Sequence, residues 1–460
     1  MEIRLREIAR KLLWANVIFS LFYKFVVEDL GGPGWISYIT DVMLLLSVFF
    51  IALDRDQFAP KRQRIAHRSI AVAMLVFVSI STVSAFANSV SPVLFFWALR
   101  NTCRFFIFFI CCVMVIDTSD WRRFIGFLTK TVVANFFIVA SQYFFLGLRD
   151  DYLNGLFGSY AGGNAVVNTV FCVVTAWLLA DYFAGNRKLK KIIVPIIAML
   201  LTSALNELKF YYIEFVAMLI IFLVLSPTNQ KNLLKHLLII IIGISIVGLS
   251  LQVFFIFYPG FSTFLSPDAL YDYLFARSYN SSETLYVAGV PVMNRLSSLT
   301  IIPDYFFNDI GDQFLGLGFG STEYSRVDLF TSSFANTYAE TNYQGYSVSY
   351  ILLETGFLGV LCYFSIFTIM LIVCARKVSA SDPHIRASCL FGTAIAVIGF
   401  LLCFYNAALR IETSGYLFFL AMAVPFIYAN GEGVASYAKD DKKSSEKHRT
   451  WRESGLKTLC

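Results

Sequence analysis

Three arginines that could bind an anion lie in a long polar segment, residues 258–346, between stretches of apolar sequence. They are Arg277, Arg295 and Arg326. The planar guanidinium group donates two parallel hydrogen bonds and suits phosphate oxygens. The segment is therefore a candidate site for a ligand that carries phosphate, although the rest of its charge is acidic: Asp268, Asp272, Glu283, Asp304, Asp309, Asp312, Glu323, Asp328 and Glu340.

A second pair of arginines lies inside an apolar stretch. Arg100 and Arg104 are four residues apart and share one helix face, while residues 93–116 contain no Asp or Glu. An ionisable residue near the centre of a bilayer costs roughly 2.5–3.5 kcal/mol on insertion scales, so both arginines need an explanation. Two explanations are open. Each arginine pairs with a carboxylate on another helix, or the two bind phosphate together.

Two short turns supply further candidates. Glu207 and Lys209 stand in the sequence NELK, and Arg410 precedes Glu412 in RIETSG. Each turn is either an exposed charged connection or part of a ligand site. Glu354 lies in LLETGFLG, where the flanking glycines predict close helix packing and a structural hydrogen bond explains the carboxylate.

The surrounding sequence predicts an all-α, polytopic integral membrane protein. Hydrophobic residues make up 57 % of the 460 residues and charged residues 15 %, whereas soluble domains contain about 25 % charged residues. Runs of about 20 apolar residues predict about twelve spans. The pair 192–206 and 210–226 forms either two short helices meeting at the outer surface or one long bent helix. The predicted spans are 12–30, 35–53, 69–87, 93–116, 124–146, 164–184, 192–206, 210–226, 237–258, 346–375, 387–409 and 413–430.

The distribution of Lys and Arg predicts the orientation. One set of connections, which includes 61–64, 187–191 and the tail after 430, is much richer in basic residues than the other, and basic loops stay in the cytoplasm. Both termini are thus predicted to be cytoplasmic. The large loop 258–346, between the ninth and tenth spans, is predicted to be extracytoplasmic. Residues 1–430 are predicted to form one membrane domain, and 431–460 are predicted to be a charged, disordered tail.

One stretch of the large loop has an amphipathic pattern. The apolar spacing over residues 292–302 predicts a short helix up to Pro303 that lies on the membrane and brings Arg295 to headgroup level.

Several classes of protein are excluded. The net charge of +6 resides in short loops between apolar runs, which is not a nucleic-acid-binding face. No zinc, nucleotide or dinucleotide motif occurs, and the glycine-rich GLGFGS at 316–321 is predicted to be a turn. We therefore expect no cofactor and no metal. All four histidines fall in segments predicted to be cytoplasmic, so none can serve a reaction at the outer face.

The plan of the chain resembles the O-antigen polymerase (Wzy-type) family, whose members have about twelve spans and one large periplasmic loop late in the chain. Locally, FGSYAGGN (157–164), LTSALNELKFYYIEF (201–215), NRLSSL (294–299), LGLGFGS (315–321) and YSVSYILLETGFLGVLCYF (346–364) are similar to motifs of that family. Related O-antigen ligases often carry a His near the exit of this loop. Tyr346 and Ser347 stand there instead, which favours polymerase over ligase.

The resemblance implies a metal-independent glycosyltransferase of the GT-C type in the bacterial inner membrane. Such an enzyme joins oligosaccharide units carried on undecaprenyl diphosphate and can work with a polysaccharide chain-length regulator. A flippase for the same lipid would also need cations, but it would not need a large one-sided loop. Under this reading, substrate diphosphates are bound by residues from distant parts of the chain: Arg100, Arg104, Asn164, Lys209, Arg277, Arg295, Arg326 and Arg410.

Catalysis is assigned to Glu207, Arg295 and Arg410. The two arginines stabilise the departing diphosphate. Glu207 is the first candidate for the general base because the turn places it beside Lys209 at the outer surface. Glu340 and Asp304 are weaker candidates. Glu207 could instead simply balance Lys209, and the phosphate oxygens of the donor would then act as the base.

Overall fold

The computed structural model describes residues 5–54, 65–226, 230–259, 266, 271 and 285–430. The substrate-binding candidate Arg277 and the tail 431–460 lie outside the described residues. The long helices are α1 (Leu5–Lys24), α2 (Ile39–Leu53), α3 (Ile65–Ala87), α4 (Pro92–Val115), α5 (Thr118–Phe145), α6 (Asn164–Phe183), α7 (Ile193–Leu205), α8 (Lys209–Leu225), α9 (Gln230–Phe257), α14 (Ser347–Ala375), α15 (Pro383–Tyr405) and a final helix, Glu412–Asn430.

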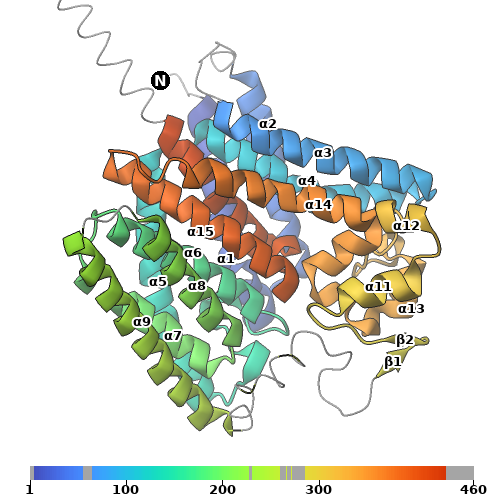
Figure 1. The fold of residues 1–460 in the computed structure, drawn as a ribbon. Helices are drawn as coiled ribbons and strands as arrows, with labels where there is room; N and C mark the ends of the chain where they lie inside the picture. The colour runs from blue at the N-terminus through green and yellow to red at the C-terminus, as the bar shows by residue number, and fades with distance from the viewer. Residues whose placement is uncertain are drawn as a thin grey trace, which may run out of the picture.

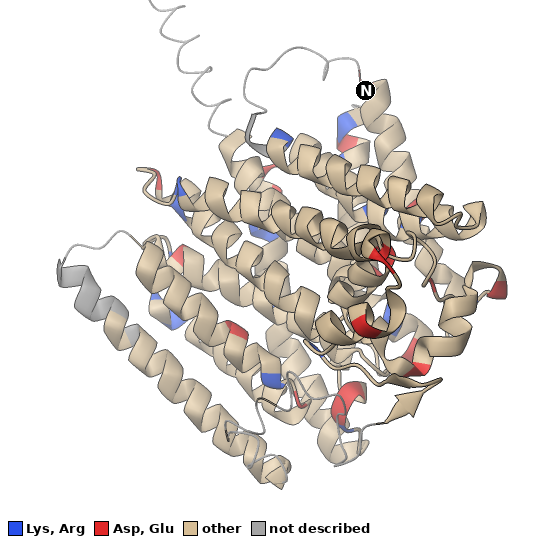
Figure 2. Ribbon diagram, turned by 45° about the vertical axis from the view of Figure 1, so that its right-hand side comes forward, with Lys and Arg blue, Asp and Glu red and all other residues tan. Residues whose placement is uncertain are grey.

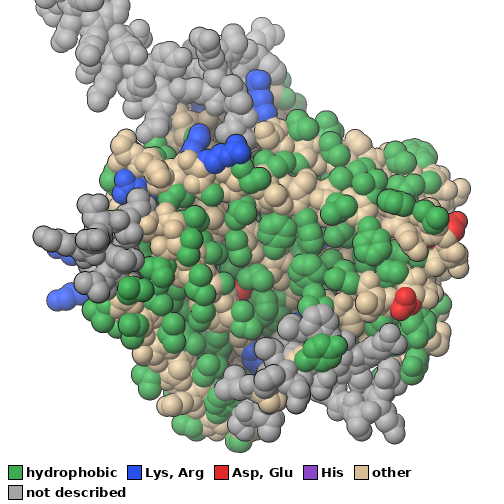
Figure 3. All heavy atoms as spheres, viewed as in Figure 1, with side chains coloured by type: hydrophobic (Ala, Val, Ile, Leu, Met, Phe, Trp, Pro, Cys, Tyr) green, Lys and Arg blue, Asp and Glu red, His purple; other side chains and the backbone are tan. Residues whose placement is uncertain are grey.

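The all-α membrane fold is confirmed. Nine helices of the described chain are long and apolar enough to cross a membrane. Large apolar side chains such as Leu75, Phe86, Phe145 and Leu361 are exposed, and Figure 3 shows hydrophobic side chains spread over the visible face. A soluble protein rarely exposes apolar patches of this extent. The surface is therefore suited to lipid.

The helices pack around α6. In its membrane-spanning window, 94 % of the residues are buried, and α6 contacts α5, α8 and α15. A helix that is apolar on every side belongs in such a central position. Figure 1 shows α14 lying between α3 and α15, which are its main packing partners. The strands in the described residues are β1 (Tyr286–Val287) and β2 (Val290–Pro291), which pair as a small antiparallel hairpin.

Three short helices of the late polar segment pack at one end of the bundle: α11 (Ser298–Phe306), α12 (Ile310–Leu315) and α13 (Ser333–Tyr338). Close backbone contact fixes α12 against α14. Gly356 interrupts α14 with φ +63°, and a Cβ there would lie 2.4 Å from the carbonyl carbon of Phe314. Gly316, with φ +70°, approaches the backbone of α14 equally closely. Only glycine fits both positions without strain.

The segment between α7 and α8 resolves the alternative that the sequence leaves open. The two helices are separate, and Glu207 between them has φ +59°, a left-handed conformation that a helix cannot contain. The turn at Glu207 therefore separates α7 from α8.

The amphipathic helix predicted over residues 292–302 is wrong in its bounds. The helix begins at Ser298 and continues through Pro303, so Arg295 precedes it. Ile301 and Ile302 are fully buried, and α11 packs on α14. Burial against protein, rather than against lipid, explains the apolar spacing.

Candidate functional site

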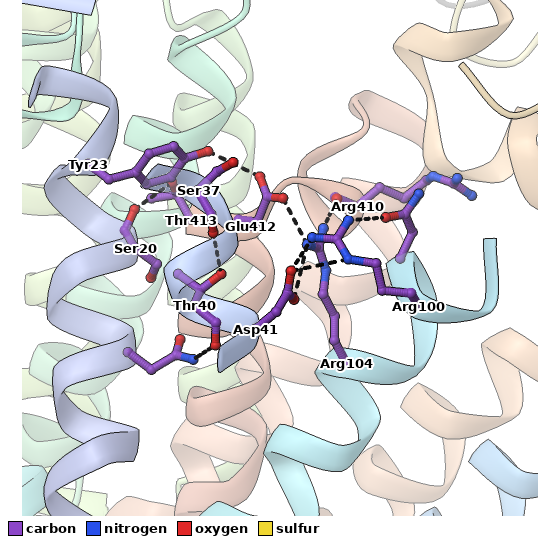
Figure 4. Close-up of polar contacts among 12 residues, drawn as sticks. Ser20, Tyr23, Ser37, Thr40, Asp41, Arg100, Arg104, Arg410, Glu412 and Thr413 are labelled. Atoms are coloured by element: carbon purple, nitrogen blue, oxygen red, sulfur yellow. Dashed lines mark hydrogen bonds and ion pairs between the residues drawn. The ribbon is translucent and has the colours of Figure 1, made fainter. Parts of the chain in front are cut away.

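Charged residues are few and scattered along the ribbon of the bundle (Figure 2). One group, which we call the arginine cluster, consists of Asp41, Arg100, Arg104 and Glu412. Arg100 donates to Asp41, with its Nε 3.1 Å from Oδ2, and Arg104 donates to Glu412 over 2.8 Å. Figure 4 shows these side chains converging from α4, α2 and the start of the final helix. Each arginine thus pairs with a carboxylate on another helix, the first of the two explanations open from sequence.

The arginine cluster extends into the bundle through hydroxyl groups. Tyr23 of α1 donates to Glu412 over 3.1 Å, and Thr413 donates to the carbonyl of Ser20 over 2.7 Å. The Arg104 side chain is only 5 % exposed, and its Nε has no hydrogen-bond partner within the described structure. A buried guanidinium needs compensating charge, which Glu412 supplies.

Arg410 lies next to this cluster in the turn Ala408–Arg410 and forms an ion pair with Glu323. Glu323 is almost completely buried and also accepts from Asn101 of α4 over 3.0 Å. The Arg410 guanidinium carbon lies 3.8 Å from the centre of the Tyr350 ring. Burial alone would lower the pKa of Arg410, but the charge and hydrogen bond of Glu323, together with Tyr350 and Glu354, outweigh burial and raise that pKa. Arg410 is therefore a fixed cation.

Glu354 lies beside Arg410 in the interior. Its Oε1 accepts from the Thr322 hydroxyl over 2.8 Å, and its Oε2 has no partner among the residues described. Both Glu354 and Arg410 line a cavity of about 20 Å³. A cavity of that size can hold about one water molecule. The predicted structural hydrogen bond of Glu354 is confirmed in the contact with Thr322, which joins α14 to the polar segment.

A second group, which we call the Glu207 cluster, consists of Asp150, Glu207, Lys209 and Arg295. Lys209 Nζ lies 2.7 Å from Glu207 Oε1, and the Asp150 carboxyl group lies close enough to Glu207 to affect its pKa. Burial, more than the charge of Asp150, raises the pKa of Glu207. The cluster thus holds a carboxyl group whose pKa lies above the ordinary value, beside two cations.

Arg295 brings the late polar segment to this group. It is 9 % exposed and lies close enough to Lys209 for the two cations to repel each other. Its guanidinium carbon is 5.2 Å from the ring centre of Tyr405, and that ring stacks on Phe210 beside Lys209. Two cations held together in this way create a local preference for an anion.

The segment from Tyr405 to Glu412 connects the two groups. Tyr405 contacts Arg295 of the Glu207 cluster, Arg410 binds Glu323, and Glu412 binds Arg104 of the arginine cluster. One short connection between α15 and the final helix therefore contacts both groups of charges.

The remaining predicted site residues are placed apart from these groups. Asn164 opens α6 and donates to Asp151. Arg326 is 76 % exposed, and its nearest carboxylate is Glu28, 3.9 Å away. Asp304 and Glu340, the weaker candidates for the base, are exposed.

Three functional candidates were missed by the sequence reasoning: Asp41, Asp150 and Glu323. Asp41 could have been recognised from the sequence, because it is the only charged residue of the predicted span 35–53. An acid alone in one span and two arginines alone in another predict an ion pair between them. Asp150 and Glu323 carried no comparable signal, since each lies in a polar connection among other charges.

No protein-family model matches this chain, and no curated protein sequence matches it. Within the described ranges, no group of three His, Cys, Asp or Glu side chains could hold a metal ion. The chemistry that the site offers is that of two neighbouring cations beside a carboxyl group whose pKa is raised by burial.

Proposed function

We propose that this protein is a glycosyltransferase that joins oligosaccharide units carried on undecaprenyl diphosphate into a surface polysaccharide. The observation that carries this proposal is the Glu207 cluster, in which a carboxyl group, Lys209 and Arg295 meet from separate parts of the chain. Transfer of a sugar from a diphosphate needs positive charge at the leaving group and a base at the attacking hydroxyl.

The proposed setting is the outer face of a bacterial inner membrane. Lys and Arg side chains gather at the edge of the molecule away from α11–α13 (Figure 3), and basic ends of membrane proteins stay in the cytoplasm. The nine long apolar helices, together with α1, α7 and α8, make up twelve proposed spans. The polar segment 258–346 is then proposed to face outward, and Arg295 in its described part lies at the Glu207 cluster.

Lys209 and Arg295 are proposed to hold the diphosphate of the donor as it departs. Glu207 removes the proton from the acceptor hydroxyl, so that its oxygen bonds to the anomeric carbon while the bond from that carbon to the diphosphate oxygen breaks. The proton then rests on the Glu207 carboxyl group, and the electron pair leaves with the diphosphate. Asp150 lies against Glu207 and can relay the proton.

Arg100, Arg104 and Arg410 have a different relation to substrate in this proposal. Each is paired with a carboxylate, so binding a phosphate requires one carboxylate to be exchanged for it. Of these, Arg410 is the best placed for the acceptor diphosphate because it lies beside the connection to Tyr405. The two pairs of the arginine cluster hold α2, α4 and the final helix together.

The test is turnover of lipid-linked repeat units by the purified protein in liposomes. We expect polymers longer than one unit from the wild type and single units from Glu207→Gln. Lys188→Gln, an exposed residue of another connection, is the matched control with normal product. Movement of intact lipid-linked units across the liposome membrane without polymer would instead indicate a flippase, and transfer to a lipid A core would indicate a ligase.

A further inference from the structure

A groove of about 420 Å³ opens at the opposite end of the bundle from α11–α13. It lies where α14 ends, α15 begins and the final helix ends, and Figure 1 shows the connection between α14 and α15 at that end. Its apolar lining comes mainly from Cys374, Ile385, Cys389, Pro425 and Phe426. Cavities of roughly 300–1,000 Å³ with apolar linings are typical of ligand sites.

The rim of the groove carries two cations, Arg376 and Lys377. Both are exposed, and neither forms an ion pair with any residue that the structure describes. Arg386 nearby behaves differently, since its Nη2 and Nε donate to the carbonyl of Ala380 over 2.9 and 3.2 Å. Arg386 therefore fixes the connection, while Arg376 and Lys377 keep their charge available.

We propose that this groove binds one anionic phospholipid, with the phosphate at Arg376 and Lys377 and an acyl chain along the apolar lining. Basic pockets between the ends of membrane helices suit such headgroups, because the anionic leaflet lies at the same level. The groove is far from the proposed catalytic groups, so this proposal does not depend on the proposed transferase activity.

The charge of the chain favours a lipid over the protein's own tail as occupant. Residues 431–460 follow directly after the final helix and contain seven Lys and Arg against five Asp and Glu. A net positive segment is repelled by Arg376 and Lys377, whereas a phosphate group is attracted. The same tail adds to the attraction of this end for an anionic membrane surface.

Native mass spectrometry of the full-length protein, titrated with phosphatidylglycerol or phosphatidylcholine, tests the proposal. We expect one phosphatidylglycerol to bind more tightly than phosphatidylcholine. The double variant Arg376→Gln/Lys377→Gln should weaken phosphatidylglycerol binding by about 30-fold, as expected for the loss of two cations near the lipid phosphate. Lys11→Gln/Arg68→Gln removes two exposed cations that do not line the groove and should bind normally.

A second variant, Ala429→Phe, distinguishes lipid binding in the groove from attraction of the lipid to general surface charge. It fills part of the groove and leaves every charge in place, so it should also weaken phosphatidylglycerol binding. Full binding by Ala429→Phe, full binding by the double variant, or equal affinity for both lipids would each overturn the proposal. Inorganic phosphate at equal concentration should not displace the lipid. Displacement would show that the apolar groove contributes nothing to the lipid affinity.

Discussion

The carboxyl groups of Asp150 and Glu207 lie close together, although the two residues are 57 positions apart in the chain (207 − 150). Both residues have left-handed backbone conformations, with φ +51° and +59°. Such conformations are unfavourable for residues other than glycine and occur often at functional sites. Two strained turns thus bring two acids together beside Lys209 and Arg295.

The first prediction concerns the pH dependence of turnover. The pKa of Glu207 is raised, chiefly by burial and further by Asp150, while Lys209 opposes the shift. A base must be deprotonated, so activity should fall as pH drops through a value above the ordinary Glu pKa of about 4.3. Asp150→Asn should move that acidic limb to lower pH, because it removes the negative charge that disfavours the Glu207 carboxylate.

The ionisable groups near Glu207 determine which variants serve as controls for this pH profile. These groups are Asp150, Lys209 and Tyr258, and Arg295 acts on Lys209 from a fourth segment. Glu207→Gln should reduce turnover by about 10²–10⁴-fold and remove the acidic limb. A full rate for this variant, with the limb unchanged, would exclude Glu207 as the base and favour attack assisted by the donor phosphate.

The second prediction separates the structural and catalytic roles of Arg410. Glu323→Gln leaves Arg410 buried without its carboxylate and should lower the free energy of unfolding by about 3–5 kcal/mol. Arg410→Met/Glu323→Leu removes both charges and should recover most of that stability while polymerisation stays lost. Thermal unfolding in detergent and turnover are measured on the same samples. Polymerisation by the double variant at the wild-type rate would mean that Arg410 has no role beyond its ion pair.

The third prediction concerns Arg295. A lysine cannot reproduce two parallel hydrogen bonds to a diphosphate, so Arg295→Lys should reduce turnover nearly as much as Arg295→Ala. The loss should appear mainly in kcat, because the leaving group gains charge in the transition state. Arg326→Lys, at an exposed position, serves as the comparison. Normal polymer from Arg295→Ala at wild-type expression would remove Arg295 from the site.

The fourth prediction is the orientation in the membrane. Reporter fusions at Ser321 should show extracytoplasmic activity, and fusions after Lys457 should show cytoplasmic activity. The reason is the excess of basic residues in the connections opposite the polar segment. Cytoplasmic activity at Ser321 would reverse the proposed topology and place the Glu207 cluster on the wrong side for lipid-linked polymerisation.

The fifth prediction concerns the docking of α12 on α14. Gly356→Ala places a Cβ against the backbone of Phe314 in a left-handed conformation, and should lower stability by about 1–3 kcal/mol. Gly126→Ala, inside α5 with no atom in its way, should be neutral or stabilising. Protease sensitivity of the polar segment should rise in Gly356→Ala alone. Equal stability of both variants would show that α12 is not held at this contact.

The sequence by itself determined the helices and the positions of the charges. Each long apolar run became a helix near its predicted bounds, because the number of apolar residues needed to cross a bilayer is a local property of the chain. The isolated charges of residues 93–116 were equally visible, whereas the sequence left open whether residues 192–226 form two helices, as α7 and α8 do, or one bent helix. The amphipathic spacing near Arg295 was misassigned, since burial against protein and burial against lipid leave the same pattern.

The tertiary structure decided which charges meet. Arg410 pairs with Glu323 and Glu207 lies close to Asp150, and neither relationship follows from the sequence, whereas the isolation of Asp41 in its span pointed to its pairing with Arg100. Each partner lies on a different element, so the pairing depends on how the helices pack and on where the polar segment returns to the bundle. The sequence offers several carboxylates as possible partners for each arginine. Because burying an unpaired charge is costly, the partner is determined only when the helices have assembled.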